Sequence, residues 1–318
     1  MAGVPPLLLF DSVAIPSPLS SLPAWPRRSL LLALAGAGLQ ACTAARPAPA
    51  PHRSERFELV SADGQRRYRV QLVLPHAAPP AGGHPLLVML DGNAAFAALT
   101  DEVLARQAAS GRPLAIATLG HESPQGLDVA ARAFDYTPPV PGENPTWDDA
   151  SRQRTGGGAD LFLDLVAQQV LPEVHRRVRC DPARSTLWGH SYGGLLALYA
   201  LFTRPALFAR YAAADPSLWW HDGFMLSVQD RARPLPADRR TQLLLMAGGA
   251  GTATRSQRPG MDDTAFNRRA MLSDATPRLA ERLALRAGLD LTFQTFPGVG
   301  HGAMRPASIP PTLAFAAA

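Results

Sequence analysis

The segment GHSYGG places Ser191 between Gly189 and Gly193, with a histidine before the serine and a tyrosine after it. The apolar run STLW precedes this segment, and the helical pattern LLALYALF follows it. A G-x-S-x-G pattern between a buried strand and a helix forms a strained turn that exposes the serine hydroxyl. Side chains at the two glycine positions would collide across so sharp a turn. The context therefore predicts a nucleophile at Ser191 rather than an ordinary turn rich in small residues.

A serine hydroxyl is a weak nucleophile unless a general base lies within hydrogen-bond reach. The segment LTFQTFPGVGHGAM places His301 in a glycine-rich loop after the last predicted strand, where the imidazole can approach Ser191. His190 adjoins the serine, but its side chain is expected to point away from the tip of the turn. The sequence therefore predicts His301 as the base.

Hydrolysis through a serine also needs two backbone N–H groups that bind the developing oxyanion. One comes from the residue after the nucleophile, here Tyr192. The segment VMLDGNAAF offers Gly92 or Asn93 as the second donor, and a plain strand-to-helix turn is the alternative interpretation of its Asp-Gly pair.

The carboxylate that would orient the histidine is less evident. It is expected after the strand that ends at Gly248, but the next carboxylates are Asp262 and Asp263. These two are the candidate acids, with surface solvation as the alternative. A Ser–His pair without a carboxylate is a third interpretation. Asp215 follows a different strand and is the poorer candidate.

Strand and helix patterns alternate along the chain and must position these groups. Two alternating runs flank Asp63 and Gly64 in residues 56–75 and predict a hairpin. Strand patterns then occupy residues 85–90, 113–120, 185–189, 208–215, 241–249 and 289–297, and helical patterns occupy 94–109, 159–178, 191–204 and 275–288. This alternation predicts an α/β fold with a mainly parallel sheet and helices on both faces. The long connection between Gly120 and Gly158 has the length of a lid or binding loop.

The N-terminus predicts export. In PRRSLLLALAGAGLQAC a basic pair precedes an apolar run that ends in small residues and Cys42, a layout similar to a bacterial lipoprotein signal. We therefore expect an export signal in residues 1–42, a Pro/Ala-rich linker in 43–56 and a catalytic domain in 57–318. Lipid on Cys42 would anchor the protein to a membrane; ordinary signal cleavage is the alternative.

The composition excludes two classes of partner. The net charge is +5, but the 31 basic residues, all arginine, are scattered and form no basic run. Nucleic-acid binding is therefore not expected. The two cysteines have no metal-type spacing, so no metal or cofactor is expected.

The segments LDGNAAF, FDYTPP, GHSYGG, DPSLWW and FPGVGHGAM follow one another in this order. With them, residues 57–318 resemble the esterase-D-like branch of the α/β-hydrolases, and within it the periplasmic trilactone esterases that open enterobactin-type siderophores. The resemblance implies an α/β-hydrolase fold and a Ser–His dyad. It also implies that Arg132 meets an anionic catecholate. The family's SPSLWW appears here as DPSLWW, so Asp215 changes the local contacts.

The predicted function is that of an exported serine esterase acting on a ferric or apo catecholate siderophore. Trp219 and Trp220 could stack on the aromatic rings of this substrate, with core packing as the alternative. Other enzymes of the same fold remain open, namely a short-chain carboxylesterase, an S-formylglutathione-hydrolase-like enzyme or an acyltransferase. A non-catalytic lipoprotein that binds a siderophore or peptide belongs to another class, and the presence of both Ser191 and His301 argues against it.

Overall fold

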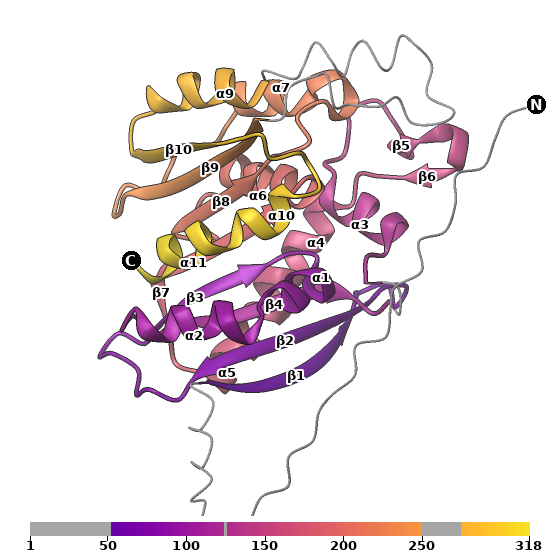
Figure 1. Ribbon diagram of the computed structural model, residues 1–318. Helices are drawn as coiled ribbons and strands as arrows, with labels where there is room; N and C mark the ends of the chain where they lie inside the picture. Colours follow the sequence, from indigo (N-terminus) through magenta and orange to yellow (C-terminus); the bar gives the residue numbers. More distant parts are fainter. Residues whose placement is uncertain (1–51, 124–125, 250–274) are drawn as a thin grey trace, which may run out of the picture. The chain divides into compact units, whose positions relative to one another are not determined.

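An eight-stranded sheet in the order β1-β2-β4-β3-β7-β8-β9-β10 forms the centre of the protein (Figure 1). The computed structural model describes residues 52–123, 126–249 and 275–318. Strands β3, β4, β7, β8, β9 and β10 pair in parallel, whereas β1 and β2 are antiparallel to their neighbours. The prediction of a mainly parallel sheet is therefore confirmed. The strands are β1 His52–Val60, β2 Arg67–Pro75, β3 His84–Met89, β4 Ala115–His121, β7 Cys180–His190, β8 Arg210–Ala214, β9 Thr241–Gly249 and β10 Leu289–Pro297, with β5 Trp147–Asp149 and β6 Arg154–Thr155 pairing separately.

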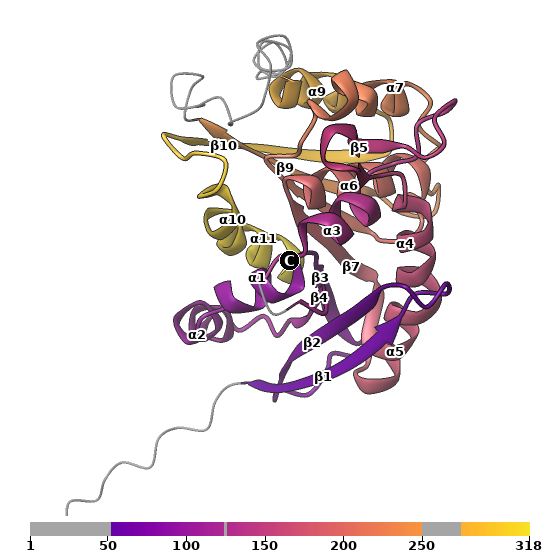
Figure 2. The same cartoon turned by 90° about the vertical axis from the view of Figure 1, so that its right-hand side faces the viewer.

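Helices cover both faces of the sheet, as Figure 2 shows. One face carries α1, α2, α10 and α11, whose apolar side chains pack in one core cluster. The other face carries α3 to α7 and α9, which pack in a second, larger cluster. The helices are α1 Gly92–Ala98, α2 Asp101–Ala109, α3 Val129–Tyr136, α4 Ala159–Leu165, α5 Leu171–Arg177, α6 Tyr192–Thr203, α7 Phe224–Asp230, α9 Ala275–Ala284, α10 Met304–Ala307 and α11 Ile309–Ala317, with the shorter turns η1 Ala150–Arg152, η2 Val166–Val170 and η3 Trp220–Gly223.

Several predicted boundaries differ from the structure. Residues 52–56, expected in the linker, belong to β1, because they pair with β2 along its whole length. The single helix expected over residues 94–109 is two helices, since Thr100 interrupts the run and its hydroxyl accepts a hydrogen bond from the Val103 N–H. The prediction did not include α10 and α11, whose sequence contains three prolines.

Three predicted site residues, Cys42, Asp262 and Asp263, lie outside the described residues. Within the described part of the chain, no helix combines the length and apolarity needed to cross a bilayer. The Cys180 thiol is free and buried, and burial raises its pKa to about 12. It is therefore an inert core residue.

Candidate active site

Ser191 lies at the sharp turn between β7 and α6. Its backbone has φ 61° and ψ −117°, a combination that non-glycine residues rarely adopt. The chain reverses so closely that a Cβ on Gly189 would lie 2.2 Å from the carbonyl carbon of Gly193. The strand–turn–helix context that the sequence predicted is therefore present, and it presents the serine at the carboxyl edge of the sheet.

His301 reaches Ser191 from the loop after β10. Its Nε2 lies 3.0 Å from the Ser191 Oγ, and its Nδ1 lies 2.5 Å from Oδ2 of Asp215. The carboxylate can only accept, so Nδ1 carries the proton and Nε2 is left to accept the serine proton. Asp215 is thus the carboxylate that contacts the histidine. The prediction of a Ser–His pair without a carboxylate partner is wrong, because His301 has this contact. Asp215 was also underestimated as a candidate.

The backbone around β8 and β9 explains how Asp215 reaches the histidine. Its own N–H donates to the carbonyl of Met246 in the neighbouring strand, at 2.8 Å, and its φ of 43° turns the side chain toward the loop of His301. The Gly248 N–H donates to the other carboxylate oxygen at 3.3 Å. Burial alone would raise the pKa of Asp215, but the hydrogen bond and charge of His301 and the Gly248 N–H outweigh it and lower the pKa. Asp215 is therefore held as a carboxylate.

His190 contributes to the site in a way that the sequence did not reveal. Its Nε2–H donates to the backbone carbonyl of His301 at 2.8 Å, and the two imidazole rings lie 4.8 Å apart. Burial, and after it repulsion from His301, lowers the pKa of His190 to about 4. At neutral pH a neutral ring of His190 therefore fixes the loop that carries His301.

The second oxyanion donor is expected from the turn before α1, and this turn lies against the serine turn. A Cβ on Gly193 would lie 3.4 Å from the Leu90 Cβ and 3.8 Å from a carboxylate oxygen of Asp91. A Cβ on Gly92 would lie 2.4 Å from the Gly120 nitrogen, so only glycine fits there. The first N–H groups of a helix have no partner within it, which suits Gly92 and Asn93 to bind an oxyanion.

Arg132 lies in the expected region but is not presented as a free cation. Its Nε and Nη2 donate to the two carboxylate oxygens of Asp91, each at 2.8 Å, and only 12% of its side chain is exposed. The guanidinium also lies over the rings of Tyr136 and Tyr192, 5.6 and 5.2 Å from their centroids. The Tyr136 hydroxyl in turn accepts the Asp91 N–H at 3.1 Å. Arg132 therefore holds the turn before Gly92 and is already neutralised by a carboxylate.

The long connection after β4 is tied to the nucleophile turn by Asp148. Its carboxylate accepts from the Tyr192 hydroxyl at 2.7 Å, from Trp220 Nε1 at 3.0 Å and from Arg154 Nε at 2.5 Å, and its side chain is fully buried. Sequence reasoning missed this residue, because one aspartate in a polar loop carries no local signal.

The two tryptophans have different environments. Trp220 is buried and bonded to Asp148, so it belongs to the core and cannot stack on a substrate. Trp219 is only half-buried, and its ring lies 5.8 Å from that of Tyr192. Of the pair, only Trp219 keeps a partly exposed side chain.

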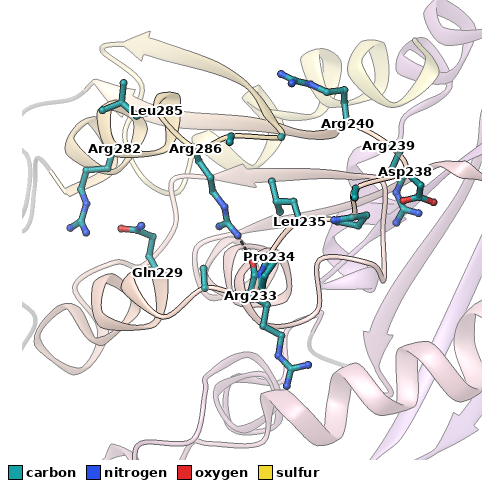
Figure 3. A pocket seen from close by; sticks show the side chains of 15 residues that line it. Gln229, Arg233, Pro234, Leu235, Asp238, Arg239, Arg240, Arg282, Leu285 and Arg286 are labelled. Atoms are coloured by element: carbon teal, nitrogen blue, oxygen red, sulfur yellow. Dashed lines mark hydrogen bonds between the residues drawn. The ribbon is translucent and has the colours of Figure 1, made fainter.

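A cluster of arginines is found elsewhere in the fold. A pocket of about 940 Å³ at the amino ends of β9 and β10 is lined by Arg233, Arg239, Arg240, Arg282 and Arg286 (Figure 3). Arg240 and Arg282 pair with Asp290 and Asp230, and Arg286 donates to a backbone carbonyl. Figure 3 shows the labelled guanidinium groups pointing in different directions, so they do not converge on one ligand.

Comparison with known proteins agrees with this site. A model of the family described as "Putative esterase" matches residues 61–244. The apo-salmochelin esterase of Escherichia coli O6:H1 is 32% identical over 250 residues, which cover 78% of this chain and 74% of that protein. The ferri-bacillibactin esterase BesA of Bacillus subtilis is 29% identical over 263 residues, covering 80% and 86%.

The solved structures point the same way. The enterobactin hydrolase IroE in complex with DFP superposes with a TM-score of 0.65 at 29% identity, covering 85% of this chain and 97% of that one. The mainly parallel sheet and its helices have the arrangement of the α/β-hydrolase fold, as the motifs implied. By sequence and by fold, the chain belongs to the esterase family of serine hydrolases.

Proposed function

We propose that this protein is a siderophore esterase in which Ser191 is the nucleophile, His301 the general base and Asp215 the residue that orients His301. The contact of His301 with both Ser191 and Asp215 carries the proposal. The relatives named above act on apo-salmochelin, ferri-bacillibactin and enterobactin, which supports a siderophore ester as the substrate.

The geometry supports a two-step hydrolysis. Ser191 Oγ attacks the ester carbonyl carbon and gives its proton to His301 Nε2, while Asp215 keeps the other ring nitrogen protonated. The backbone N–H of Tyr192 and that of Gly92 or Asn93 bind the oxyanion. His301 then protonates the leaving alcohol, and water attacks the acyl-enzyme by the same route.

The contacts of Arg132 bear on the substrate. Because Arg132 is paired with Asp91, it offers no unpaired charge to a ferric tricatecholate. We therefore assign substrate recognition to the half-buried Trp219 beside Tyr192 rather than to Arg132.

The test is hydrolysis of a panel of apo and ferric siderophore esters and p-nitrophenyl esters by the purified protein. Ser191→Ala should lower turnover by several orders of magnitude with an unchanged melting temperature, and it should abolish labelling by a fluorophosphonate. Ser227→Ala, which removes a hydroxyl on α7 that donates to the Phe224 carbonyl and accepts from Arg231 Nη2, is the matched control and should keep full activity. Turnover retained by Ser191→Ala would refute the assignment. Cleavage of p-nitrophenyl esters alone would leave a general carboxylesterase.

We further propose that the protein is exported and anchored through lipid on Cys42. The segment LAGAGLQAC supports this proposal. Cys42→Ser should move the protein from the membrane fraction to the soluble fraction and remove lipid labelling. A wild type without lipid label would indicate ordinary signal cleavage.

A further inference from the structure

A second serine touches the nucleophile. Ser217 follows β8 in the segment DPSLWW, and its Oγ lies 3.1 Å from the Oγ of Ser191. Its backbone N–H donates to the Ser191 carbonyl, also at 3.1 Å, so two contacts fix its place. Ser217 is only 1% exposed, and among the described residues its hydroxyl has no partner other than Ser191.

The direction of this hydrogen bond follows from the rest of the site. Asp215 accepts the Nδ1–H of His301, so Nε2 can only accept. The single proton of the Ser191 hydroxyl is therefore donated to Nε2, at 3.0 Å. Ser191 Oγ then has only lone pairs to offer to Ser217. The Ser217 hydroxyl is therefore the donor, and Ser191 Oγ is the acceptor, in the hydrogen bond between the two serines.

We propose that Ser217 is a further catalytic residue, whose hydroxyl donates to Ser191 Oγ and assists the departure of this oxygen from the acyl-enzyme. The proposal rests on the proposed function, because it needs Ser191 to become acylated. A hydrogen-bond donor stabilises an oxygen most when that oxygen gains negative charge.

The two half-reactions use Ser191 Oγ in opposite ways. In acylation its electron pair forms the bond to the carbonyl carbon, its proton passes to His301 Nε2, and the alcohol leaves with that proton. In deacylation water bonds to the acyl carbon and gives a proton to Nε2. The C–Oγ bond then breaks, its electron pair stays on Oγ, and Oγ takes the proton from Nε2. Charge builds on Oγ as it leaves, so the Ser217 hydroxyl favours deacylation, whereas in acylation it occupies a lone pair of the nucleophile.

The experiment separates the two steps with p-nitrophenyl acetate in stopped flow, where the burst reports acylation and the steady rate reports deacylation. Ser217→Ala should lower the deacylation rate constant about ten- to a hundredfold, as expected for loss of a bond to a charged group, and change acylation less than about threefold. The acetyl adduct on Ser191 should then accumulate and be detected by mass spectrometry. Ser217→Cys, a weaker donor of similar size, should lie between Ser217→Ala and the wild type.

Ser185→Ala is the control, because it removes another buried serine hydroxyl, one in the middle of β7 that donates to the Pro182 carbonyl and accepts the Ala209 N–H. It should leave both rate constants unchanged. Equal losses of both rate constants in Ser217→Ala, or unchanged deacylation, would overturn the role of Ser217. A wild type that cleaves neither p-nitrophenyl acetate nor any siderophore ester would instead refute the proposed function, so the two failures are told apart.

Discussion

Replacing Asp215 by asparagine is the sharpest test of the site. The asparagine oxygen can still accept the Gly248 N–H, which leaves its NH₂ group facing His301 Nδ1. An NH₂ group cannot accept, so His301 would move its proton to Nε2 and could no longer take the proton of Ser191.

The expected magnitude follows from the burial of the pair. Loss of the corresponding buried aspartate in the best-studied serine protease lowers kcat about 10⁴-fold. Here 16% of the Asp215 side chain and 47% of the His301 side chain are exposed, so water can replace part of the interaction. We therefore expect kcat to fall roughly two to four orders of magnitude, or about 3 to 5 kcal/mol in the barrier.

The assay is steady-state hydrolysis of p-nitrophenyl acetate and of a siderophore ester, with the melting temperature as the check on folding. Asp215→Ser places at this position the residue of the related SPSLWW motif. Its hydroxyl can accept the Nδ1–H, so Asp215→Ser should lose less activity than Asp215→Asn. Asp262→Asn and Asp263→Asn should each lose less than about tenfold. A folded Asp215→Asn enzyme within tenfold of the wild type would refute the triad.

Three further outcomes are expected. Arg132→Ala should lower kcat/KM about equally for a ferric siderophore and a neutral p-nitrophenyl ester, since it leaves Asp91 buried and unpaired; a loss confined to the anionic substrate would restore Arg132 as a substrate-binding residue. Asp148→Asn should lower the free energy of unfolding in urea by about 3 kcal/mol or more, because it breaks a buried pair with Arg154, and unchanged stability would contradict the role given to this carboxylate. The unfolded chain binds a proton at His190 near pH 6.5 and the folded protein only near pH 4, so the free energy of unfolding should fall by about 3 kcal/mol as the pH falls through this interval. In urea titrations the free energy of unfolding of His190→Gln should fall less steeply with pH. A fall as steep as that of the wild type would disprove the assignment.

Much of the site could be predicted because its signals are local. The turn at Ser191 needs only a strand, two glycines and a helix that are contiguous in the chain, and β9 and β10 were predicted at the bounds that the structure has. The histidine could be placed because it follows the last strand of a parallel sheet, whose carboxyl ends meet at one edge. The alternation of strands and helices indicated the fold for the same reason.

The partners of these residues depend on the tertiary structure. Asp215 and His301 are separated by 86 positions, Arg132 and Asp91 by 41, and Asp148 and Tyr192 by 44. No local sequence pattern predicts such pairs. Which carboxylate contacts which arginine or histidine depends on the order of the strands in the sheet. The order β7-β8-β9 places Asp215 next to the nucleophile strand and beneath the loop of His301. The nucleophile turn, the histidine loop and the layered fold could therefore be predicted from local patterns. Which aspartate meets His301, and the pairing of Arg132 with Asp91, depend on packing across the sheet, because both contacts join segments that are distant in the chain.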